Sequence, residues 1–139
     1  MSKTIARTEH NIKPVIYSDF FTDFSASTDT GQLNRKTNEN AVKQSVRNLL
    51  LTDFYERPFQ PEIGSNLRSL LFEPFTAATE IRAKTYVEEV FDNHEPRADL
   101  LKVNITADPD RGAIFVEIYF RIINSVQPVS LNITLERTR

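Results

Sequence analysis

Two histidines, His10 and His94, are the side chains of this sequence best suited to metal binding or proton transfer at neutral pH. Neither has a second histidine four residues away, the spacing that places two metal ligands on one helix face. A serine nucleophile would have only these two histidines as its base. The sequence has no cysteine, and its three glycines are isolated, so thiolate chemistry and a glycine-rich phosphate loop are excluded. We therefore predict no metal site and no cofactor.

Pairs of carboxylates are the remaining candidates for catalysis. A glycoside hydrolase needs only two, one that donates a proton and one that stays ionised. Glutamates on a charged helix face are usually solvated, and no segment is expected to hold two of them in one cleft. A muramidase-type glycoside hydrolase is therefore the alternative function. The glutamates considered are Glu56, Glu62, Glu73, Glu88, Glu89 and Glu95.

Two charged motifs that contain proline are better suited to docking than to catalysis. Arg57 precedes Pro58 and Pro61, which we expect to stiffen an extended segment and so lower the entropy lost on binding. Arg57 carries a forked donor that matches a carboxylate. The predicted partner-docking residues are Arg57, Pro58, Glu95, Pro96 and Arg97.

The second of these motifs, Glu95–Pro96–Arg97, has two interpretations. A residue before proline is biased toward extended geometry, and residues two apart in an extended chain point to the same side. Glu95 and Arg97 are therefore expected to project together. They either form an internal ion pair that pins a helix end to the first strand, or dock on a partner protein.

Three helices are predicted between Asn38 and Pro96. Asn38 is the expected N-cap of the first helix. Ser65 is expected to cap a short second helix that Pro74 stops, and Thr76 a longer third helix that ends before Pro96. Their apolar faces follow helical spacing. These faces consist of Val42, Val46, Leu49 and Leu50, then Leu67, Leu70 and Leu71, then Ala83, Val87, Val90 and Phe91.

The sequence after Pro96 alternates between apolar and polar residues, which is typical of strands. The turn at 108–112 and a second connection at 124–128 separate three such strands. Short connections predict an antiparallel meander, so we expect an α+β fold with three helices on one face of a three-stranded C-terminal sheet. The inward residues are Leu101, Val103, Ile105 and Ala107, then Ile114, Val116, Ile118, Phe120 and Ile122, then Val129, Leu131, Ile133 and Leu135.

The third strand is predicted to leave one edge free for a strand of another protein. Its outward residues Ser130, Asn132 and Thr134 do not repel an incoming strand. Only Pro128 and the charged end at 136–137 protect it. The alternative is that the chain's own N-terminal arm covers the edge. The candidate edge residues are Val129, Ser130, Leu131, Asn132, Ile133 and Thr134.

Residues 1–37 are predicted to form an N-terminal arm, and residues 38–139 a single domain. The arm is polar but carries four closely spaced aromatic residues, which a fully solvated segment would not normally hold. They pack either on the chain's own core or on a neighbouring protein. The middle strand also has apolar residues on its outer side, so we expect the arm or another chain to cover it. The aromatic residues of the arm are Tyr17, Phe20, Phe21 and Phe24, and the outer residues of the strand are Phe115, Tyr119 and Ile123.

Charge and hydropathy exclude two classes of partner. Seventeen basic and nineteen acidic residues nearly balance, so no single-sign field favours nucleic acid or an anionic membrane. The apolar runs are far too short to span a bilayer, and no secretory signal is apparent.

Three ordered motifs resemble the baseplate wedge and sheath-initiator family of contractile tails, found in myovirus-type phages and in the type VI secretion baseplate. These motifs are the stretch Glu56–Leu67, the sequence Leu70–Pro74 and the tripeptide Glu95–Arg97. The resemblance runs from about residue 40 to residue 136. It departs from the family pattern at Ile63, where an aromatic residue is expected. Members of this family have carried a lysozyme-like label, which no constellation of residues in this sequence supports.

The resemblance implies a structural protein of the virion tail, assembled in the host cytoplasm and present in multiple symmetric copies, although a monomer when isolated. It would sit on the helical bundle of the larger wedge scaffold proteins, near the tail tube. Its edge strand would face the tail sheath protein and begin the sheath lattice.

Overall fold

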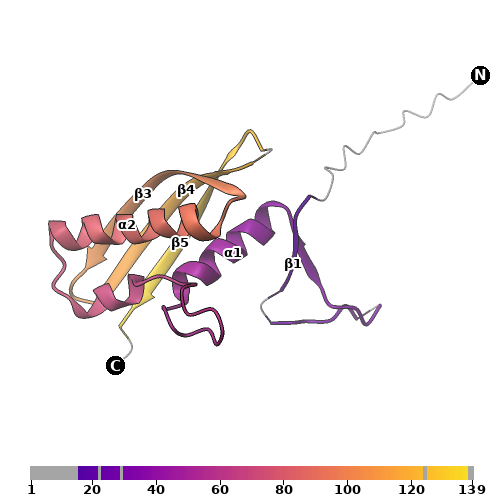
Figure 1. Ribbon diagram of the computed structural model, residues 1–139, viewed down its shortest axis with the longest axis horizontal. Coiled ribbons are helices and arrows are strands. Elements are labelled where there is room, and N and C mark those ends of the chain that lie inside the picture. The colour runs from indigo at the N-terminus through magenta and orange to yellow at the C-terminus, as the bar shows by residue number, and fades with distance from the viewer. Residues whose placement is uncertain (1–15, 22, 29, 124, 138–139) are drawn as a thin grey trace, which may run out of the picture.

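The computed structural model describes residues 16–21, 23–28, 30–123 and 125–137, and its helices precede a C-terminal sheet (Figure 1). In the sheet, the strand order is β3-β4-β5 and both pairs are antiparallel. The chain is therefore an α+β protein with a three-stranded meander, as predicted. The elements are β1 (Ser18–Phe20), β2 (Arg35–Thr37), α1 (Glu39–Leu51), the 3-10 helix η1 (Leu67–Phe72), α2 (Ala77–His94), β3 (Ala98–Asp108), β4 (Ala113–Ile122) and β5 (Pro128–Glu136).

One face of the sheet is buried, and Figure 1 shows α1 and α2 on the same side of it. Strand β5 alternates exposed and buried residues along its whole length, and the buried ones join apolar residues of all three helices in one cluster. Phe120 of β4 is fully buried, with its ring centroid 5.5 Å from that of Phe91 in α2. Burying one such side chain contributes roughly 1.5–3 kcal/mol, so this contact anchors α2 to the sheet.

Strand β3 departs from the predicted alternation at its start. Its register with β4 shifts between Leu100 and Lys102, so Leu101 is an extra residue without a facing partner. Leu101 is consequently 53% exposed, and Leu100 packs against the core instead. The prediction that Leu101 points inward is therefore wrong, because the bulge reverses the phase of the alternation.

The predicted helix caps are only partly confirmed. Thr76 caps α2 through a reciprocal pair of bonds with Thr79, as a capping box does. Asn38 precedes α1 but makes no side-chain cap; its Oδ1 accepts from the backbone N–H of Ile16 at 2.8 Å. Ser65 lies one residue before the cap position of η1, and its hydroxyl donates to the carbonyl of Leu50 at 2.8 Å. Both side chains therefore bond to distant segments of the chain. The Oγ of Ser65 also accepts from the N–H of Leu67, the first residue of η1, at 3.4 Å, so the predicted capping by Ser65 is confirmed in part.

The described part of the arm is a short hairpin, β1–β2, whose main contacts with the domain are with α1. Neither prediction for its aromatic residues describes all of them. Tyr17 packs against the core, whereas Phe20 is 42% exposed and Phe24 is 67% exposed. Cations cover two of the rings, because Arg35 lies over Phe20 and the ammonium of Lys36 lies over Phe21.

Gly64 gives a test of this packing, because the backbone there passes close to the end of α1. Its φ is +152°, and an added Cβ would lie 2.7 Å from the backbone oxygen of Thr52. We expect Gly64→Ala to lower the free energy of unfolding by about 1–3 kcal/mol, the cost typical of forced backbone strain. Urea denaturation followed by circular dichroism measures this loss.

Gly31→Ala is the matched control. Gly31 also has a positive φ, +67°, but an added Cβ there has open space around it. We expect a smaller loss of stability than in Gly64→Ala. Equal losses would mean that the close approach to Thr52 does not determine this position.

Candidate docking surfaces

The segment that carries Arg57 and Pro58 is a turn-rich loop, so the prediction of an extended stretch is wrong. The backbone N–H of Gln60 donates to the carbonyl of Arg57 at 3.4 Å, which closes a turn with Pro58 in its second position. Proline presets the φ that this position requires. Phe59 follows with a φ of +70° and reverses the chain direction. Pro58 therefore fixes a turn, with the side chains of Arg57, Pro58 and Phe59 exposed.

The base of this loop is closed by backbone bonds. The N–H of Tyr55 donates to the carbonyl of Pro61 at 2.9 Å, and the N–H of Ser65 donates to the carbonyl of Thr52 at 2.8 Å. Because both ends are tied, the loop presents its exposed tip at Phe59 on a defined frame.

Glu95 and Arg97 form a bidentate ion pair within the chain. The Nε of Arg97 lies 2.6 Å from one carboxylate oxygen of Glu95, and its Nη2 lies 3.0 Å from the other. The side chain of Glu95 is 1% exposed and that of Arg97 is 32% exposed. The hydrogen bonds to Glu95 raise the pKa of the Arg97 guanidinium above its ordinary value. The internal ion pair is therefore the interpretation that the structure shows, and docking by the same residues remains a prediction.

The geometry around this pair differs from the extended chain we expected. The N–H of Ala98 donates to the carbonyl of Glu95 at 3.2 Å, so Pro96 lies in a turn. The guanidinium carbon of Arg97 also lies 5.5 Å from the ring centre of Tyr17 in the arm. Arg97 thus connects the end of α2, the start of β3 and the arm.

A polar groove of about 370 Å³ joins Arg57 to the end of α2. Arg57 forms no ion pair with any described residue. The sequence did not predict that Arg57 and the other lining residues meet here, because only the tertiary fold brings the arm, α1, the loop and α2 together. The groove is lined by Asp19, Ser45, Asn48, Leu49, Arg57, Ile63, Asn93 and His94.

The hydrogen-bond pattern of β5 shows which backbone groups face its outer edge. The N–H of Arg137 donates to the carbonyl of Gly112 at 3.1 Å, which makes these facing residues a hydrogen-bonded pair. Bonded and non-bonded pairs alternate along an antiparallel ladder, and the register of β4 with β5 has no shift. The N–H and C=O groups of Ser130, Asn132 and Thr134 therefore point away from β4.

One group on this edge already has a partner. The Nη2 of Arg47 in α1 donates to the carbonyl oxygen of Asn132 at 3.1 Å. Within the described residues, no strand pairs with this side of β5, because β1 and β2 form their own sheet. The described part of the arm therefore leaves the edge uncovered.

The outer face of the sheet also remains exposed in the described part of the chain. Phe115 is 37% exposed and Ile123 is 42% exposed, so the described part of the arm does not bury them. Glu117 accepts hydrogen bonds from the hydroxyl of Tyr119 at 2.7 Å and from the amide of Asn104 at 3.1 Å. These bonds lower the pKa of the Glu117 carboxyl and raise that of Tyr119.

The described residues contain no group of three histidine, aspartate or glutamate side chains that could hold a metal ion. None of their helices combines the length and the apolar character that a bilayer crossing requires. Several glutamates considered for catalysis are already engaged: Glu73 pairs with Arg82, Glu95 pairs with Arg97, and Glu56 accepts from a backbone N–H.

Comparison with known proteins identifies a family. A family model described as "Baseplate wedge protein gp25" matches residues 36–127. The "Baseplate wedge protein gp25" of Enterobacteria phage T4 is 31% identical over 110 residues, which cover 79% of this chain and 83% of that protein.

Solved structures share the fold. A "putative tail lysozyme" from Geobacter sulfurreducens is 22% identical, covers 70% of this chain and 89% of its own, and has a TM-score of 0.64. A chain of the anti-feeding prophage baseplate is 23% identical, covers 86% of this chain and 85% of its own, with a TM-score of 0.62. A chain of the postcontracted pyocin R2 baseplate is 21% identical, covers 82% of this chain and 98% of its own, and has a TM-score of 0.52.

The family model covers more than half of the chain, and the phage T4 relative exceeds 30% identity over most of both proteins. The resemblance predicted from the three motifs is therefore confirmed. The chain belongs to the baseplate wedge protein gp25 family and is a structural component of a contractile-tail baseplate rather than an enzyme.

Proposed function

We propose that this baseplate wedge protein connects two partners. Its groove around Arg57 and its Glu95–Arg97 turn dock on the helical bundle of the larger wedge scaffold proteins. Its strand β5 takes up a strand of the tail sheath protein and so starts the sheath. The observation that carries this proposal is the outer edge of β5, where the alternate residues Ser130, Asn132 and Thr134 direct backbone groups away from β4.

Arg57 supports the docking half of the proposal. Its guanidinium is exposed, lines the polar groove and has no ion-pair partner among the described residues. A forked cation of this kind is well matched to a carboxylate of the scaffold. Arg97 contributes in a second way, because its guanidinium has five N–H donors and the Glu95 carboxylate occupies two of them.

The geometry of β5 supports the sheath half. Strand addition needs N–H and C=O groups in a regular row on an open edge. The side chains beside that row are small and uncharged, and lysine residues or bulges that normally blunt an edge are absent from β5.

Arg57→Ala tests the docking groove. Arg57 makes no ion pair, so we expect the free energy of unfolding to change by less than about 0.5 kcal/mol. Recovery of the scaffold proteins with the tagged chain should fall by roughly tenfold, because an interface contact to a charge is lost. Arg111→Ala, in the exposed turn between β3 and β4, is the control and should retain full recovery. Normal recovery with Arg57→Ala would rule out this groove as the docking site.

Arg97 variants separate stability from docking. Because Glu95 is buried, Arg97→Ala leaves a carboxylate without its partner, and we expect a loss of about 3 kcal/mol in thermal or urea unfolding. Arg97→Lys keeps the positive charge but loses the forked guanidinium. This variant should therefore fold, but it should bind the scaffold more weakly than the unaltered chain does. A loss below about 1 kcal/mol in Arg97→Ala, the range of an exposed pair, would contradict this account of the buried pair.

Asn132→Pro tests the sheath edge. Proline removes an N–H that points away from β4, so the β4–β5 ladder keeps its hydrogen bonds. The variant should fold and join the wedge but fail to start sheath polymerisation, as seen by electron microscopy of tails. Asn132→Ala keeps the backbone donor and is the matched control, with sheaths of normal length expected. Normal sheaths on Asn132→Pro would show that β5 is not the template.

A further inference from the structure

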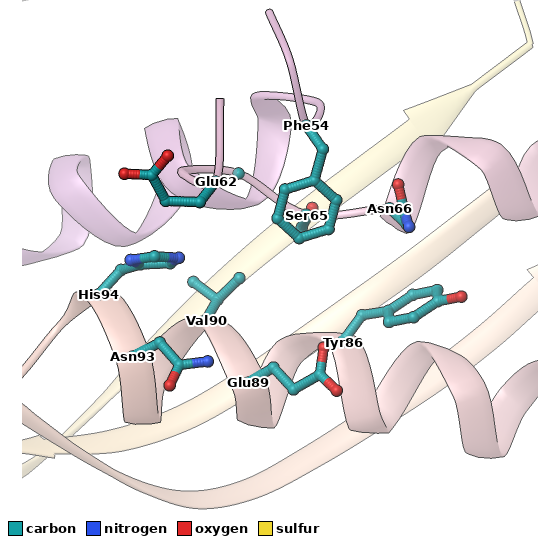
Figure 2. Close-up of a pocket in the computed structure, with 10 residues that line it drawn as sticks. Phe54, Glu62, Ser65, Asn66, Tyr86, Glu89, Val90, Asn93 and His94 are labelled. Atoms are coloured by element: carbon teal, nitrogen blue, oxygen red, sulfur yellow. The ribbon is translucent and has the colours of Figure 1, made fainter. Parts of the chain in front are cut away.

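A second groove lies on the other side of the Arg57 loop, between the loop and α2. Its volume is about 340 Å³. Figure 2 shows Phe54 of the loop facing Val90 and Tyr86 of α2 across this groove. A further hollow continues from it along the loop past Tyr55 and Pro61. The walls of the groove are therefore largely apolar.

Apart from His94, the acidic and basic side chains that line this groove are carboxylates. Glu62 of the loop and Glu89 of α2 line it, and no lysine or arginine does (Figure 2). Both carboxylates are exposed, and neither forms an ion pair with a described residue. Within the described part of the chain, both carboxylates are therefore available to a partner.

The chemistry of such a groove selects its occupant. A lysine or arginine side chain packs its aliphatic stem on apolar surface and keeps its charged end beside carboxylates. The ring of Tyr86 adds a face on which a cation is attracted. An acidic or purely apolar segment would leave Glu62 and Glu89 without partners at an interface.

We infer that this groove binds a lysine- or arginine-bearing segment of a neighbouring baseplate protein. The inference rests on the proposed docking function and extends it. The Arg57 groove and this acidic groove both include Asn93 and His94, so one partner surface can reach both. That partner then presents a carboxylate to Arg57 and a basic side chain to Glu62 and Glu89.

Charge reversal tests this inference in the full chain, co-expressed with the other wedge proteins. Glu62→Lys and Glu89→Lys should each reduce recovery of the partner by roughly tenfold or more, because like charges then face each other across the interface. Glu88→Lys is the matched control, since Glu88 is an exposed neighbour on α2 that does not line the groove. Circular dichroism and thermal melting check that all three variants fold.

A photo-crosslinking residue, benzoylphenylalanine, at Tyr86 identifies the occupant in assembling tails. The cross-linked peptide should contain lysine or arginine, and the same residue at Glu88 should not capture it. A captured peptide without a basic residue, or full partner recovery by both charge-reversal variants, overturns the inference while the proposed function stands. If the unaltered chain recovers no wedge protein, the proposed function and this inference both fail.

Discussion

The buried carboxylate of Glu95 is the constraint on which the arrangement of this domain depends. A carboxylate removed from water costs several kcal/mol unless a cation and hydrogen bonds replace the water. Arg97 is held in place on both sides to supply them: its side chain binds Glu95, and its backbone carbonyl accepts from the N–H of Ile123 at 2.9 Å. The ion pair therefore fixes the end of α2 relative to the first paired residues of the sheet. The arm joins the same point through Tyr17.

The sequence predicted local features correctly where residues close together in the chain determine them. Thr76 caps α2 because its partner, Thr79, is three residues away, and β5 alternates because one face is buried. Long-range choices were not predictable in the same way. The Oδ1 of Asn38 accepts from an N–H of the arm instead of from an N–H of its own helix, and the local sequence does not distinguish between these two donors. Leu101 faces outward because of a β-bulge, and no residue type at this position predicts a bulge.

The same division applies to the candidate sites. The motifs named Arg57 and Glu95–Arg97 as docking residues, but they did not show that a polar and an acidic groove meet at Asn93 and His94. These grooves form between α2 and a loop whose turns depend on left-handed residues, Tyr55 and Phe59. Aromatic residues seldom adopt that conformation, and the pattern of prolines suggested an extended chain instead. The residues of the edge strand were predictable because alternation alone assigns the outward side chains of β5.

Arg47 occupies one backbone acceptor on the outer edge of β5, which bears on how this edge avoids accidental pairing. An unprotected edge pairs with any available strand, which leads to aggregation. Arg47 donates to the carbonyl of Asn132, at the centre of the outward row, from a helix that packs against β5. An incoming strand must displace this single hydrogen bond before it can form a continuous ladder. A strand that pairs along the whole edge replaces the hydrogen bond from Arg47 with several backbone hydrogen bonds. A short or irregular contact also displaces the Arg47 hydrogen bond, but it forms few backbone hydrogen bonds in return. Under the proposed function, this difference in hydrogen bonds favours a long, in-register strand over accidental pairing. The difference depends on the contact between Arg47 and Asn132, which are 85 positions apart in the sequence.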